Sequence, residues 1–157
     1  MAKLGRYSAD RKKIEALDCF GATAAAAAIT IDKAKCGTIF ICTPAGNDAN
    51  NGSVITLPSE ADAGKGWWCK FVLAADIVND GDDDNDIVIQ NAAGDTDDMI
   101  VHLPGDADAD GAGHADGASV TFEETAAKAG DEVEVICTGD RWLVHVRSAI
   151  VGGVTKQ

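Results

Sequence analysis

The chain has 157 residues and a mass of 16.2 kDa, the usual size of one domain. Its formal net charge is −13, but residues 1–13 carry five basic residues against Asp10, so the remainder carries −17. A body this acidic repels phosphate backbones and anionic membranes, and apolar runs are far shorter than the ~20 residues that span a bilayer. We therefore expect neither nucleic acid nor a membrane as a partner.

The start of the chain differs in charge from the rest, which suggests a basic N-terminal arm over residues 1–18 and a β-sandwich domain over residues 19–157. Residues 9–17 favour a short helix. The segment lacks an apolar stretch of signal-peptide length, so classical secretion is not expected. The arm is either a solvated tail or an extension that docks on a partner.

Period-two alternation of apolar residues, which places them on one face of a strand, recurs along the chain. Prolines follow the first two of these segments and mark strand exits. The alanine tract at residues 24–28 leads into a strand-like segment and is expected to be extended. The predicted strands cover residues 37–42, 54–57, 67–73, 87–89, 120–122, 133–137 and 142–146.

Two local features refine this pattern. The alternation predicts that Trp67 and Trp68 point to opposite faces of one strand, one inward and one outward. Residues 138–141 (TGDR) form a tight-turn sequence, so the last two clear strands are expected to make a hairpin. With about eight to ten short strands and only one further short helix, at residues 124–128, we predict an all-β fold, an antiparallel β-sandwich or jelly roll.

The residues of common catalytic motifs are missing. None of His102, His114 and His145 stands beside a plausible nucleophile, and no nucleophile elbow, HExxH helix, phosphate loop or dinucleotide fingerprint is present. We therefore expect no enzyme, with a hydrolase assembled from distant acids as the remaining catalytic alternative. The five cysteines form no CxxC pair and are expected to be reduced and mostly buried: Cys19, Cys36, Cys42, Cys69 and Cys137.

Two acidic segments, residues 80–86 and 106–111, offer the oxygen ligands that calcium prefers. Asp106, Asp108 and Asp110 match the opening of a calcium loop, but the position of its closing glutamate is Gly117, which excludes an EF-hand. A flexible solvated loop is the favoured interpretation, so no cofactor is expected, and calcium remains a side hypothesis.

Five motifs in order resemble the head decoration proteins of tailed bacteriophages. They are GRYSADR at residues 5–11, CGTIF at 36–40, ITLP at 55–58, GKGWWCKF at 64–71 and GDRW at 139–142. The acidic insertions around residues 79–86 and 105–117 depart from that family. Related β-domains also occur in phage tails and fibres, so an adhesin-type carbohydrate-binding domain is the alternative.

The resemblance implies a cement protein made in the host bacterial cytoplasm. It would bind the major capsid protein on the outer surface of the virion as a homotrimer and carry out no reaction. On this hypothesis the arm docks on the coat through Arg6, Tyr7, Arg11, Lys12 and Lys13. The subunit interface would comprise the outward member of the pair Trp67 and Trp68, together with Leu143 and His145.

Overall fold

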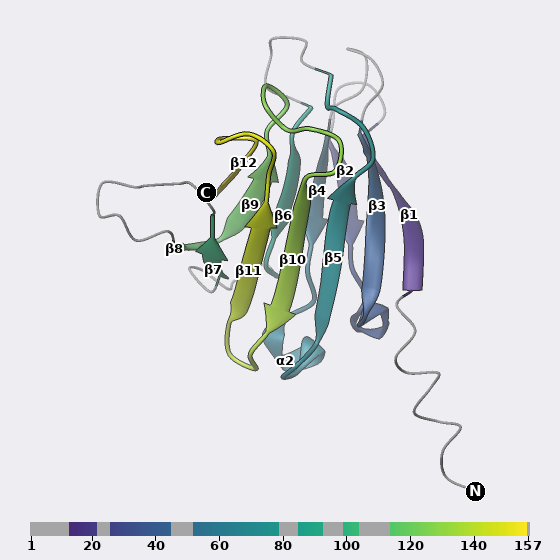
Figure 1. The fold of residues 1–157 in the computed structure, drawn as a ribbon. Helices are drawn as coiled ribbons and strands as arrows, with labels where there is room; N and C mark the ends of the chain where they lie inside the picture. Colours follow the sequence, from purple (N-terminus) through teal and green to yellow (C-terminus); the bar gives the residue numbers. More distant parts are fainter. Residues whose placement is uncertain are drawn as a thin grey trace, which may run out of the picture.

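Two β-sheets packed face to face make up the fold, so the predicted all-β sandwich is confirmed (Figure 1). The structure is a computed structural model that describes residues 13–21, 26–44, 52–78, 85–92, 99–103 and 114–156, with residues 114–116 described by their backbone. Twelve strands lie within these residues. All seven predicted strand segments overlap strands, and only Gly37, Leu57 and Trp67 lie just outside them. Of the alanine tract, Ala27 and Ala28 lie in the strand Ala27–Thr30, as expected, and residues 24 and 25 lie outside the described residues.

The larger sheet, here called sheet A, has seven strands in the order β1-β3-β5-β10-β11-β7-β8. Their bounds are β1 Lys13–Cys19, β3 Thr38–Pro44, β5 Trp68–Leu73, β10 Glu132–Cys137, β11 Trp142–Arg147, β7 Met99–His102 and β8 His114–Gly117. Sheet B has the order β12-β9-β6-β4-β2. Its strands are β12 Val154–Lys156, β9 Ser119–Phe122, β6 Ile87–Gln90, β4 Ser53–Thr56 and β2 Ala27–Thr30.

The chain changes sheet at every step from β1 to β7, and this winding determines strand direction. After each strand the chain crosses to the opposite sheet, forms one strand there and then returns. The strand that it next adds to the first sheet therefore runs parallel to the previous strand of that sheet. Hence β1, β3 and β5 are parallel, as are β2, β4 and β6. Strand β7 is also parallel to β11, which comes later in the chain. Half of the ten strand pairs are therefore parallel, so both sheets are mixed rather than purely antiparallel as predicted.

Inward-facing apolar residues of both sheets fill the space between them. Burial alternates along β5, β10 and β6, which is the pattern of strands with one face in the core and one outward. Phe40 and Phe71 stack with ring centroids 5.3 Å apart, and Trp67 packs edge-on against Trp142 at 5.5 Å. The largest fully buried side chains include Trp142, Phe71, Phe122, Ile55, Leu57 and Leu73.

Strand β1 corrects the prediction for the start of the chain. Residues 13–17 were predicted to end a helix within a separate arm, but β1 pairs with β3 in register from Lys13 with Thr38 to Cys19 with Pro44. This parallel pairing supplies backbone hydrogen bonds that outweigh the weak helix propensity of a short segment. The part of the arm before residue 13 lies outside the described residues.

The C-terminal hairpin was predicted correctly. Strands β10 and β11 pair antiparallel up to Cys137 with Trp142, and the Thr138 N–H donates to the Arg141 carbonyl at 2.8 Å. Gly139 at φ 109° takes the positive φ that this turn requires. The short helix predicted at residues 124–128 is instead a hydrogen-bonded turn, in which the Ala127 N–H donates to the Glu123 carbonyl at 2.7 Å.

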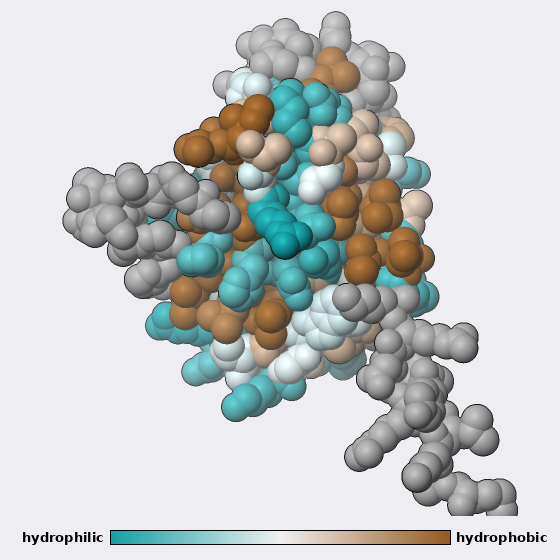
Figure 2. Space-filling model, in the orientation of Figure 1, coloured by the Kyte–Doolittle hydropathy of each residue, from teal (hydrophilic) through white to brown (hydrophobic). Residues whose placement is uncertain are grey.

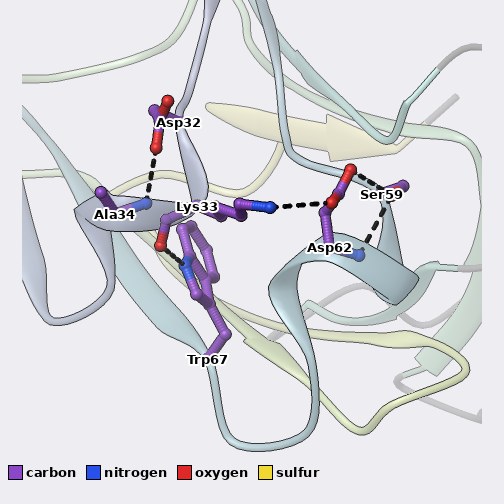
Figure 3. A network of polar contacts seen from close by, with 6 residues as sticks. All are labelled: Asp32, Lys33, Ala34, Ser59, Asp62 and Trp67. Atoms are coloured by element: carbon purple, nitrogen blue, oxygen red, sulfur yellow. Dashed lines mark hydrogen bonds and ion pairs between the residues drawn. The ribbon is translucent and has the colours of Figure 1, made fainter.

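Two short helical turns close the end of the sandwich where β5 begins: η1 Lys33–Lys35 and α2 Glu60–Ala63 (Figure 3). Ser59 caps α2 by accepting a hydrogen bond from the Asp62 N–H at 3.2 Å. The Lys33 ammonium reaches Asp62 at 3.1 Å, and the Trp67 indole N–H donates to the Lys33 carbonyl at 2.7 Å. These contacts fix the segment that leads into β5.

Candidate functional site

The outer face of sheet A carries three of the residues predicted for the subunit interface, Trp68, Leu143 and His145. Side chains that alternate with the core residues of β1, β3, β5, β10, β11 and β7 point away from sheet B. Figure 2 shows hydrophilic residues along the middle of this face, with hydrophobic residues over β3 and β1. The face therefore divides into apolar and charged areas.

The first apolar area lies over the β1 side of the sheet and is called here the apolar edge. It consists of Ile14, Ala16, Ile39, Ile41 and Val72. Ile14 is paired with Ile39 in register and keeps 68% of its surface exposed, which is unusual for an isoleucine in a strand. An exposed apolar cluster on an edge strand is typical of a surface that contacts another chain.

The second apolar area, called here the apolar row, crosses the sheet at one register level. Trp68 pairs with Ile136, Ile136 with Leu143, and Leu143 with Ile100. All four residues are half-buried. Figure 2 shows hydrophobic residues at the lower ends of β10 and β11, where this row lies.

The two adjacent tryptophans point to opposite faces, as predicted. Trp67 is only 4% exposed and packs in the core, so it is excluded from the predicted subunit interface. Trp68 is the outward member of the pair and shares the apolar row with Leu143. Of the four residues predicted for the interface, Trp68, Leu143 and His145 share the outer face.

A charged centre separates the two apolar areas. The Lys70 ammonium lies 3.1 Å from Glu132 and 3.6 Å from Glu134, and Arg147 lies 3.5 Å from Glu132. These side chains surround a shallow depression of about 410 Å³. Since each carboxylate there is paired with a basic group, the depression is a network of ion pairs on the surface.

The histidines form a third group on this face. His145 is the register partner of Glu134 on one side and of His102 on the other. The two imidazole ring centroids are 6.1 Å apart. Both residues are exposed. This pairing could not be predicted from the sequence, because β7 and β11 are far apart in the chain.

Of the five docking residues predicted for the arm, the structure describes Lys13 alone. Lys13 begins β1 and makes an ion pair with Glu15, which also pairs with Lys35. These two lysines, through hydrogen bonds to its carboxylate, lower the pKa of Glu15. Lys13 is therefore part of sheet A, and the other four arm residues, Arg6, Tyr7, Arg11 and Lys12, lie outside the described residues.

The calcium candidates Asp106, Asp108 and Asp110 also lie outside the described residues. Among side chains that the structure does describe, no group of three or more His, Cys, Asp or Glu is arranged to hold a metal ion. The other acidic segment, residues 80–86, ends in a structured corner, where the Glu124 carboxylate, 3% exposed, accepts a hydrogen bond from the Asn85 N–H at 3.1 Å. The sequence did not indicate this buried carboxylate.

Four of the five cysteines are buried and all five are free thiols, in agreement with the prediction. A hydrogen bond with Cys19, together with burial, raises the pKa of the Cys42 thiol well above its usual value. Burial likewise raises the pKa of Cys69. These thiols remain protonated at neutral pH and pack as small apolar groups. Cys36 is exposed.

The fold and this face define an all-β sandwich with a divided outer surface. No protein-family model, no curated protein and no solved structure matches the chain. Within the described residues, no helix has the length and apolar character needed to cross a membrane.

Proposed function

We propose that the chain is a structural protein of a tailed-phage virion, a capsid decoration protein that binds the outer surface of the head as a homotrimer and stabilises it. The observation that carries the proposal is the apolar edge, because its exposed residue Ile14 directly follows the basic segment of the chain. A partner that covers β1 would therefore meet an apolar surface next to the point where the basic segment joins the sheet.

The motifs that resemble decoration proteins support this proposal through their positions in the fold. The Gly37-Thr38 pair opens β3, and Pro58 follows the exit from β4. The glycine-rich motif leads into β5, and the GDRW motif closes the hairpin between β10 and β11. Each of these motifs lies where a strand starts or ends, so together they help to determine where the strands of the sandwich lie.

In this proposal β1 and the basic segment contact the major capsid protein. Arginine can bind carboxylates through two parallel hydrogen bonds, and tyrosine offers a rigid anchor, which suits Arg6, Arg11 and Tyr7. Ile14 and Ile39 would then be covered by the coat. The exposed apolar area gives such a contact a hydrophobic component that salt does not screen.

The apolar row is proposed to form the contact between subunits of the trimer. Trp68 and Leu143 are half-buried in the single chain and would lose further water on association. His145 borders the row and would lie at its margin. The acidic remainder of the body keeps assembled trimers from associating further, since like net charge opposes aggregation.

The experiment is binding to capsids that lack the protein, measured by co-sedimentation. Because β1 begins at Lys13, the arm is removed by starting the chain at residue 13, which leaves sheet A intact. We expect full-length protein to saturate the capsids and the truncated chain to bind at least about tenfold more weakly, while both unfold at the same temperature. Lys65→Gln, which neutralises an exposed lysine outside the arm, is the matched control and should bind normally.

Undiminished binding by the truncated chain would show that the arm does not dock. Failure of the full-length protein to bind capsids at all would exclude the decoration role. A glycan-binding measurement with and without calcium would then test the alternative, a tail, fibre or adhesin domain.

A further inference from the structure

The three histidines of the chain occupy adjacent positions in one cross-strand row. His145 on β11 pairs with His102 on β7, and the backbone of β8 pairs His114 with that same residue. They are separated by up to 43 positions in sequence, so the fold alone brings them together. Two of these imidazoles, those of His102 and His145, are described as exposed side chains on the outer face.

The separation of the two rings suits metal chelation. A zinc–nitrogen bond of about 2.0–2.1 Å places each imidazole centroid roughly 3.2 Å from the metal. Two rings at a tetrahedral angle then have centroids about 5 Å apart, and wider ligand angles bring this to about 6 Å. The observed centroid distance is 6.1 Å. The centroid distance therefore lies within the range that two imidazoles bound to one ion can span.

The surroundings leave these imidazoles accessible to a cation. Glu134, the register neighbour of His145 on the other side, has its carboxylate 3.6 Å from the Lys70 ammonium. Because Lys70 offsets the charge of this carboxylate, access for a cation depends on the exposure of the two imidazoles. Both histidines are exposed, so an ion can reach them without any opening of the sandwich.

We propose that His102 and His145 bind a divalent transition-metal ion of the zinc class, with water completing the coordination. Imidazole nitrogen is a preferred ligand of zinc, copper and nickel, whereas calcium and magnesium prefer oxygen. A bound ion would tie β7 to β11. This link adds to a parallel pairing that spans only four residues and that connects β7 and β8 to the rest of sheet A.

The test is a nickel titration of the full-length protein by calorimetry, in excess magnesium and calcium so that the acidic segments are occupied. Nickel is the probe because it favours imidazole over the oxygen ligands of those segments. We expect about one ion per chain and, for His102→Ala and His145→Ala, at least about tenfold weaker binding. The control is Arg147→Ala. Arg147 lies two residues beyond His145 on the same face, and this variant should bind nickel as the parent chain does.

A second readout separates ligation from a structural effect of the substitutions. Nickel should raise the melting temperature of the parent chain and of Arg147→Ala, but not of either histidine variant. Because both histidines are exposed, the variants should melt as the parent does in the absence of metal. A double variant that carries both His102→Ala and His145→Ala is the final check. If it binds nickel as tightly as the parent chain, or if the parent chain does not bind nickel, the proposal is overturned.

Discussion

At the level of single residues, the neighbours Trp67 and Trp68 have different roles because they point to opposite faces of sheet A. Trp67 packs against Trp142 and donates its indole N–H to the Lys33 carbonyl at 2.7 Å, which connects the core to the η1 turn (Figure 3). Trp68 is half-buried on the outer face. The alternation predicted opposite faces, but the sequence did not say which residue was inside.

Replacing each tryptophan by alanine should therefore have unequal effects on folding. Trp67→Ala leaves a cavity in the core and an unpaired carbonyl, so we expect a loss of about 3–5 kcal/mol in the free energy of unfolding. Trp68→Ala should cost less than half as much, because its side chain keeps contact with water. Urea unfolding followed by circular dichroism measures both, and equal losses would contradict the assignment of faces.

Buried polar residues could not be predicted from single positions. Asp131 is 2% exposed and accepts hydrogen bonds from the Lys128 N–H at 2.9 Å and the Ala149 N–H at 2.7 Å. In the sequence it is one of 26 acidic residues, most of them in segments that look solvated. Its role depends on loops that meet only in the folded chain.

At the level of elements, the pairing of β4 with β6 requires a close approach of two backbones. The Ser53 N–H donates to the Asp86 carbonyl at 3.0 Å. A Cβ atom on Gly52 would lie 1.9 Å from that same carbonyl oxygen and 2.6 Å from the Asn85 carbonyl. Only glycine fits this position without a shift of the backbone.

Gly52→Ala is accordingly expected to destabilise the protein by about 2–4 kcal/mol, since backbone atoms must move to admit the methyl group. Gly64→Ala is the comparison variant, because a Cβ there meets open space and adds only the backbone strain of φ 74° with ψ 162°, about 1–3 kcal/mol. Thermal unfolding compares the two variants. A smaller loss for Gly52→Ala than for Gly64→Ala would show that this approach does not constrain the fold.

Local signals predicted some elements well and missed others. The hairpin at residues 138–141 was predicted because turn residues and flanking alternation lie within ten positions. β1 was mistaken for a helix because Glu15, Ala16 and Leu17 favour helices in isolation, and its partner β3 is more than twenty residues away. The parallel pairing was missed because the alternation of apolar residues indicates only which face of a strand is buried. It does not indicate which strand lies next to it or in which direction that strand runs.

At the level of the whole molecule, charge and apolar surface are separated in a way that suits attachment to a larger assembly. In the sequence the basic segment leads into β1, the strand that carries Ile14 of the apolar edge, while the remainder of the chain carries −17. The composition predicted this asymmetry, and the alternation predicted a β-sandwich. The division of the outer face became visible only when the register placed Ile14 beside Ile39 and Trp68 beside Ile136.

The mass of the purified protein by light scattering, alone and then mixed with capsids that lack it, tests the central claim most directly. A chain of 16.2 kDa that scatters as a particle of three times this mass, and that then saturates the capsids, is the predicted result. A monomer that remains free in the presence of capsids would contradict the account.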